Sequence, residues 1–180
     1  MDNEWTVPAV EIERGMARET VIQVADGGRA SAASVTGAQL GQGRRVIALD
    51  PFNFGESRME TKDWLWSLLV AALGERPLGI QAGQIAATAR WARDRHGRAV
   101  EVHAVGPRTS LSALIAAALE ADAISGVRLQ GSFGSLAEII ERDLDARQAP
   151  ELFCFGLLET FEIEDIRALV SPRPMELVSP

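Results

Sequence analysis

The residues best placed for chemistry form the stretch Gly106-Pro107-Arg108-Thr109-Ser110, between an apolar run and an apolar helical segment. Pro107 has no N–H and suits the first position of a helix, while the hydroxyls of Thr109 and Ser110 can cap the donors that follow. A helix N-terminus with free N–H groups, two hydroxyls and the Arg108 cation could bind a carboxylate or a phosphate.

A structural role competes with anion binding at Arg108. Its guanidinium could instead pair with Asp50 or Glu56, which follow a neighbouring apolar run, and so hold two loops together. Ser110 is a weak candidate for a nucleophile, because it would lie inside the first helical turn. It would also need a histidine within about 2.6–3.2 Å to accept its proton.

A second candidate loop reads Ala25-Asp26-Gly27-Gly28-Arg29. The paired glycines Gly27 and Gly28 would let backbone N–H groups face a ligand or an oxyanion, and Arg29 follows them directly. A glycine turn that merely starts a helix is the competing interpretation. The loop is not G-x-G-x-x-G, so the sequence predicts no dinucleotide site and no other cofactor.

The histidines and the cysteine offer little chemistry. His103 lies inside an apolar run, where we expect a hydrogen-bonded core residue, and His96 lies at a helix end, where we expect it to be solvated. Cys154 is the single cysteine and reads as a small buried hydrophobe with a raised pKa. No cluster has metal-ligand spacing, so we expect no metal site.

Alternating strand and helix patterns predict the fold. The expected strands are residues 20–25, 45–49, 100–105, 124–130 and 175–178, and the expected helices are 31–40, 63–73, 79–96, 109–121, 136–147 and 158–170. This alternation implies right-handed crossovers and a doubly wound, mostly parallel five-stranded sheet with helices on both faces. We expect a polar N-terminal arm over residues 1–19, whose Trp5 packs back on the body, and one α/β domain over residues 20–180.

Composition excludes several classes of partner. The formal net charge of −7 argues against nucleic acid, which requires clustered Lys and Arg. No run reaches the roughly 18 apolar residues of a membrane span, and the first residues show no export signal. We therefore expect a soluble chain that binds neither nucleic acid nor membrane.

Several stretches occur in the order of the α/β-hydrolases and resemble the bacterial acetyl xylan esterase-like and dienelactone hydrolase-like group. They are the glycine loop at 25–29, Leu49-Asp50-Pro51-Phe52-Asn53-Phe54-Gly55-Glu56-Ser57, residues 76–84, the turn at 106–110 and Ile166 to Pro174. The similarity spans about residues 20–180. It implies a partial α/β-hydrolase core, a three-layer sandwich with strands in the order 4-3-5-6-7 of that family.

The resemblance also implies an activity, cleavage of carboxylic esters, often acetyl groups on plant polysaccharide, by Ser-His-Asp catalysis. The family's oxyanion loop falls on Gly27 and Gly28, while Arg108 occupies the nucleophile position and Ser110 the second glycine of G-x-S-x-G. The family's acid follows the strand that corresponds to residues 175–178, and its histidine follows the next strand. We therefore expect no complete triad in this chain.

Three functions stay open on this basis. The chain could be an esterase relative, a pseudoenzyme candidate if it has lost catalysis, with a small ester as its ligand. It could instead be a non-catalytic binding or scaffold module that holds an anionic or carbohydrate ligand near Arg108. The apolar segment 63–73 could cover a sheet edge or join another subunit, in a homo-oligomer or with the rest of a larger esterase-like protein, although core burial is slightly favoured.

Overall fold

One twisted sheet organises the protein. In the computed structural model, which describes residues 5–59 and 61–179, its strands are β1 (Ala9–Ile12), β2 (Thr20–Ala25), β3 (Arg45–Leu49), β4 (Val100–Val105), β5 (Ile124–Gln130) and β6 (Met175–Val178). They lie in the order β1-β3-β2-β4-β5-β6. All neighbours pair in parallel except β1, which runs antiparallel to β3.

The strand predictions are confirmed except for their number. All five expected strands form with the expected bounds, and β2 is buried along its whole length, as continuous apolar runs in a parallel sheet should be. The sheet nevertheless has six strands, because part of the N-terminal arm forms β1. Glu11 of β1 pairs with Arg45 of β3, and the Trp5 ring meets Phe52 edge-on with 5.4 Å between centroids.

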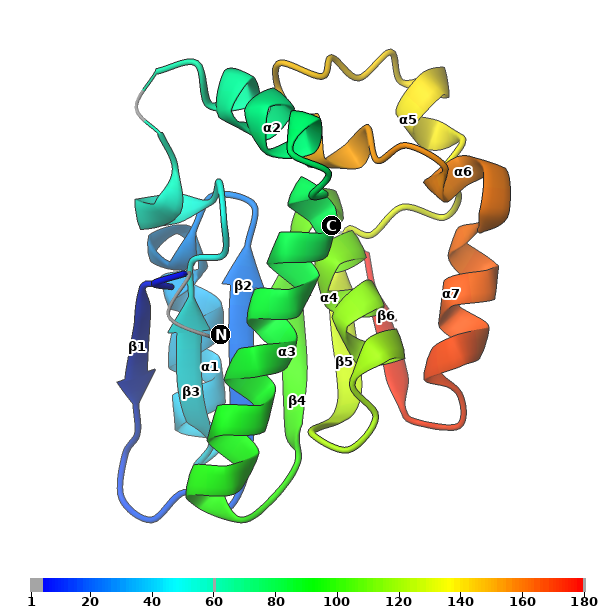
Figure 1. Ribbon diagram of the computed structural model, residues 1–180. Coiled ribbons are helices and arrows are strands. Elements are labelled where there is room, and N and C mark those ends of the chain that lie inside the picture. The colour runs from blue at the N-terminus through cyan, green and yellow to red at the C-terminus, as the bar shows by residue number, and fades with distance from the viewer. Residues whose placement is uncertain (1–4, 60, 180) are drawn as a thin grey trace.

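Helices cover both faces of the sheet. They are α1 (Ala33–Gly41), α2 (Asp63–Ala72), α3 (Pro77–His96), α4 (Pro107–Leu119), α5 (Glu138–Glu141), α6 (Leu157–Thr160) and α7 (Ile163–Val170). In Figure 1, α3, α4 and α7 lie in front of the sheet and α1 lies behind it, which confirms the doubly wound architecture. None of the helices in the described residues is both long and apolar enough to cross a bilayer.

Two of the expected helices are wrong in extent. Only α5 forms within residues 136–147, and it ends where Asp143 takes a left-handed conformation with φ 49°. The expected helix over 158–170 is broken into α6 and α7, because Glu162 and Asp165 form a capping box that starts α7. The short helices α5 and α6 lie with α2 above the carboxyl ends of the strands (Figure 1).

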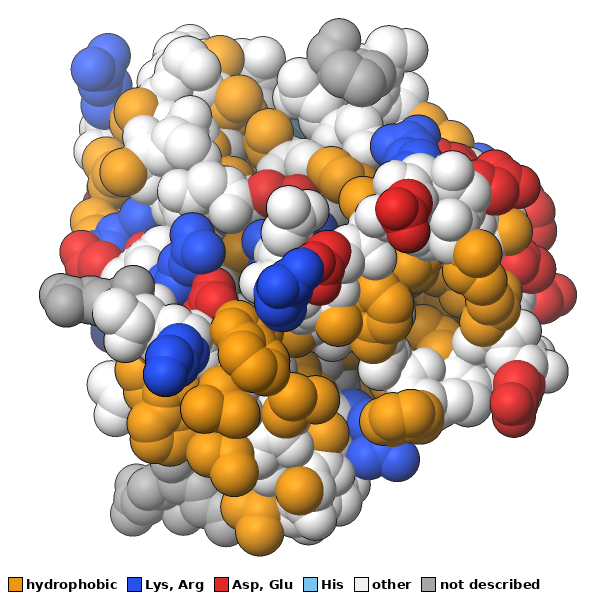
Figure 2. All heavy atoms as spheres, turned by 90° about the horizontal axis from the view of Figure 1, so that it is seen from above, with side chains coloured by type: hydrophobic (Ala, Val, Ile, Leu, Met, Phe, Trp, Pro, Cys, Tyr) orange, Lys and Arg blue, Asp and Glu red, His pale blue; other side chains and the backbone are white. Residues whose placement is uncertain are grey.

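Helix α2 has a polar buried face and an apolar exposed face, the reverse of an ordinary surface helix. Its buried residues are Asp63 and Ser67, while Leu65, Trp66, Leu68 and Leu69 are all exposed. Core burial of this segment, the interpretation slightly favoured by its composition, is therefore wrong. Figure 2 looks down on this end of the molecule, where apolar side chains gather among charged ones.

Candidate functional site

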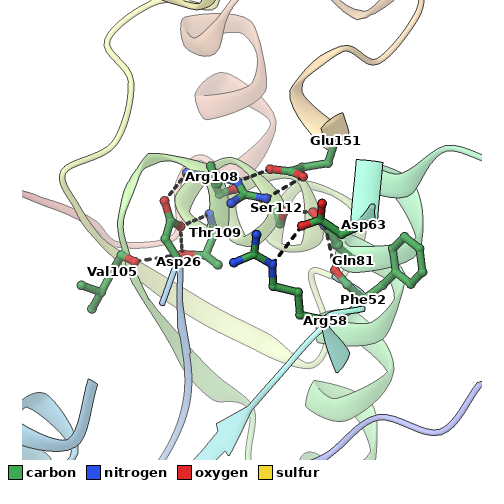
Figure 3. A network of polar contacts seen from close by, with 10 residues as sticks. All are labelled: Asp26, Phe52, Arg58, Asp63, Gln81, Val105, Arg108, Thr109, Ser112 and Glu151. Atoms are coloured by element: carbon green, nitrogen blue, oxygen red, sulfur yellow. Dashed lines mark hydrogen bonds and ion pairs between the residues drawn. The ribbon is translucent and has the colours of Figure 1, made fainter. Parts of the chain in front are cut away.

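The turn between β4 and α4 bends sharply at Gly106, while Arg108 already lies in the first turn of α4, and this helix N-terminus is occupied. Gly106 has φ 104°, and a Cβ there would overlap the Asp26 carboxyl group. That carboxylate accepts hydrogen bonds from Arg108 N at 3.2 Å, Thr109 N at 2.7 Å and Thr109 Oγ1 at 2.8 Å (Figure 3). An anion from within the chain therefore fills the anion site that the sequence predicts here.

Arg108, which the family resemblance places at the nucleophile position, is held by Glu151, which lies in a short 3₁₀ turn at Pro150–Leu152. Its Nη2 donates to Glu151 Oε2 at 2.9 Å, and its Nε donates to Oε1, so the pair is bidentate (Figure 3). The guanidinium also stacks over Phe54, with its Cζ 4.7 Å from the ring centroid. The expected pairing of Arg108 with Asp50 or Glu56 is wrong, because both carboxylates pair with Arg29 instead.

The electrostatics of Arg108 follow from this pairing. Burial is the largest single influence and disfavours the charged form, but the hydrogen bonds and charge of Glu151, together with the attraction of Asp26 and Asp63, outweigh it, so the pKa of Arg108 lies above its ordinary value. The Glu151 side chain has no exposed area. The Arg108 side chain is therefore always charged, and its charge is paired with that of Glu151.

Asp50, the residue that follows β3, holds the glycine loop at 25–29 in place. The buried Asp50 carboxylate accepts from Arg29 N at 2.7 Å, Arg29 Nη1 at 2.9 Å and Glu56 N at 3.0 Å. Gly28 N donates to Ala25 O at 2.8 Å. Two of the donors that follow Gly27 are thus engaged within the chain, as expected of a glycine turn that starts a helix.

Ser110 lies in the first turn of α4, as its spacing predicts. Its backbone N donates to Gly106 O at 3.0 Å, and its side chain is buried. Its hydroxyl has no hydrogen-bond partner among the described residues. Neither histidine pairs with it, so the structure brings no base to this hydroxyl.

Both histidines contact carboxylates elsewhere. His103 Nε2 lies 3.1 Å from Glu101 and the residue is buried, which confirms a core histidine. His96, expected to be solvated, is instead largely covered, with Nε2 3.1 Å from Glu11 and its ring edge-on to Trp91. Edge strand β1, which the sequence pattern did not predict, provides Glu11 and so explains this difference.

Sequence reasoning missed two residues of the network. Asp26 follows β2 directly, and Glu151 is a carboxylate in the apolar stretch from Ala149 to Phe153. An ionisable residue in such a stretch requires a partner when buried, which is the one signal that could have identified Glu151. In the described residues, no group of three or more His, Cys, Asp or Glu side chains could hold a metal ion.

This chain is similar to known proteins in structure and not in sequence. No family model matches the sequence, and no curated protein matches it either. Dienelactone hydrolase from Anabaena variabilis superposes with a TM-score of 0.59 and 14% identity, covering 99% of this chain and 81% of that one. A cold-adapted esterase from an Arctic intertidal metagenomic library gives 0.56 and 15%, with 99% and 79% covered.

A third protein with a similar structure matches a shorter part of this chain. A protein of Mycobacterium tuberculosis described as the non-heme bromoperoxidase BpoC gives a TM-score of 0.55 at 14% identity, covering 78% of this chain. This chain spans 50% of the length of that protein. Identities this low establish the fold alone. These superpositions, together with the parallel sheet and its crossovers, identify the chain as a protein with the α/β-hydrolase fold.

Proposed function

We propose that this chain is a non-catalytic relative of carboxylic-ester hydrolases, in which an acetyl xylan esterase-like fold serves as a binding or scaffold module. The turn before α4 carries this proposal. Arg108 stands where a nucleophile should stand, and a guanidinium that is charged and bound to Glu151 has no electron pair to offer an ester carbonyl.

The oxyanion site supports the same conclusion independently. In α/β-hydrolases the N–H of the residue after the nucleophile stabilises the oxyanion of the tetrahedral intermediate. The corresponding group here, Thr109 N, donates to the Asp26 carboxylate. A negative charge fixed at that position repels a developing oxyanion, so even the residual acceleration of about 10³–10⁴ that serine proteases keep without their triad should be missing.

Assays of ester cleavage test the proposal. The intact protein is incubated with p-nitrophenyl acetate and with acetylated xylan, beside heat-denatured protein as a control. We expect no turnover above that control for the unmodified protein, for Arg108→Ala or for Arg108→Ser, because Asp26 remains on Thr109 N in each. Turnover that Ser110→Ala abolishes and Arg108→Ala retains would overturn the proposal.

An anionic or carbohydrate ligand held at Arg108 itself is a second candidate. One observation favours it, because Nη1 of the guanidinium makes no hydrogen bond to the described residues and its side chain is 21% exposed. Titration calorimetry with glucuronate, acetate and phosphate tests it, with Arg108→Ala as the matched variant. Equal heats from both proteins, or no heat at all, would remove this candidate.

A further inference from the structure

A cavity of about 370 Å³ lies between α4 and α7, on the side of α4 away from the Arg108 network. Its floor is formed by Leu129 and Leu177, which are directly paired in adjacent strands and so point to the same face of the sheet. Its volume falls in the range of about 300–1,000 Å³ that small-molecule sites occupy. It opens at the carboxyl ends of β5 and β6, the edge where open parallel sheets bind ligands.

The floor of this cavity is incompletely covered. Leu129 is 1% exposed, but its neighbour Leu177 is 48% exposed although both lie on the face that α4 and α7 cover. The walls above it are apolar, with Leu111, Leu114 and Ile163 all buried. An apolar body that filled the space would remove the exposed part of Leu177 from water.

The polar groups of the lining carry one sign of charge. Arg142 and Arg167 are among its residues, and the described lining contains no Asp or Glu, although the whole chain has a net charge of −7. Glu138 pairs with Arg142 and also accepts a hydrogen bond from Gly134 N at 2.7 Å, while Glu164 pairs with Arg167 from a more exposed position. A guanidinium has five N–H donors, so both keep donors for a ligand.

Ser110 supplies a second, independent indication of a ligand. It belongs to the cavity lining, is 1% exposed, and its hydroxyl has no hydrogen-bond partner among the described residues. Buried polar groups are normally paired, so an unpaired hydroxyl beside a cavity calls for an acceptor from outside the chain.

We propose that this cavity binds a small monocarboxylate with an apolar body, its charge held by Arg142 and Arg167 and its body resting on Leu177. Such a ligand meets both features of the lining, since a carboxylate matches the fork of an arginine and the body covers the leucine. The proposal is independent of ester hydrolysis, because binding alone is required.

Titration calorimetry of the intact protein with sodium octanoate tests the proposal. Acetate and inorganic phosphate supply a charge without a body, and octylamine supplies the body with the opposite charge. We expect octanoate to bind and the other three to bind at least tenfold more weakly. Phosphate binding as tightly as octanoate, or octylamine doing so, would overturn the proposal.

Variants locate the binding. Arg142→Gln/Arg167→Gln should weaken octanoate binding about tenfold or more, since contacts to charged groups are lost. Leu177→Trp should abolish binding by filling the cavity, at a half-exposed position that can accept a larger ring. Arg147→Gln, which alters an exposed arginine paired with Asp145, is the matched control and should bind normally.

Thermal unfolding of each variant shows whether it is folded. Octanoate binding that is unchanged by both Leu177→Trp and the double arginine variant would refute the cavity as the site. Affinity lost in Arg108→Ala but kept in these variants would also refute it, and would favour the site at Arg108 instead. Ester turnover would overturn the proposed function and leave this inference untouched.

Discussion

Two turns at the carboxyl end of the sheet each close on an arginine–carboxylate pair, but they are built differently. In the turn after β3, Asp50 shares Arg29 with Glu56, and the Glu56 side chain is 65% exposed. At the turn before α4, Arg108 has one ion-pair partner among the described residues, Glu151, whose side chain has no exposed area. The first turn is a shared network with one carboxylate in water, and the second is a pair whose carboxylate is enclosed.

This difference determines how each turn should respond to damage. When one carboxylate of a shared network is lost, the arginine keeps the other and the solvent screens what remains. When the bidentate partner of a mostly covered charge is lost, the remaining charge stays largely desolvated and keeps only the weaker attraction of carboxylates further away. The enclosed pair thus contributes little net stability while intact, yet its disruption is costly.

The largest effect is expected from Glu151→Ala. Removing this carboxylate leaves the Arg108 cation without its bidentate partner, and breaking a buried pair in this way typically costs about 3–5 kcal/mol. Urea unfolding should show that loss as a lower midpoint at an unchanged slope. The double variant Arg108→Met/Glu151→Leu should recover most of it, and a double variant as unstable as Glu151→Ala would contradict the argument.

An intermediate effect is expected from Asp50→Ala, the matched change in the other turn. It removes an acceptor of three hydrogen bonds, but Arg29 keeps Glu56, so we expect a loss of about 2 kcal/mol. The same unfolding measurement applies, with Asp145→Ala in an exposed pair as a control near zero. A loss equal to that of Glu151→Ala would break the comparison.

The smallest effect is expected from Glu56→Gln and depends on pH. The hydrogen bond and charge of Arg29 lower the pKa of Glu56, so its contribution to stability is present above the ordinary carboxyl pKa and is lost as the pH falls below about 4. Unfolding midpoints should therefore separate the unmodified protein and Glu56→Gln slightly at pH 6. The two midpoints should approach each other as the pH is lowered toward 3, and a separation that grows on acidification would reverse the assigned sign.

The two turns also differ in how far they could be predicted. The turn after β3 consists of residues close in sequence to one another or to the neighbouring loop, and its motif resembles that of a known family. The stretch could therefore be identified from the sequence. The partner of Arg108 was not predicted, because Glu151 lies 43 residues further along the chain and Asp50 and Glu56 were equally suitable partners by sequence.

The same distinction applies to the fold. Strands β2 and β3 had their expected bounds because a run buried on both faces is apolar along almost its whole length, whereas β4, β5 and β6 carry partly exposed polar residues and were recognised from shorter apolar stretches. Strand β1 was not predicted because it is short and mostly exposed, and only its pairing with β3 makes it a strand. Helix α2 was misjudged because apolar composition does not reveal which side of a helix faces solvent.

The sequence by itself determined the positions of the parallel strands and their alternation with helices, because local apolar patterning acts within each crossover, and the resemblance to a known family supplied the strand order. Only the tertiary structure decided which carboxylate neutralises Arg108, that Asp26 occupies the helix N-terminus, and that a cavity remains beside Ser110. These depend on side chains that meet across long separations, where many pairings are chemically equivalent and packing selects one.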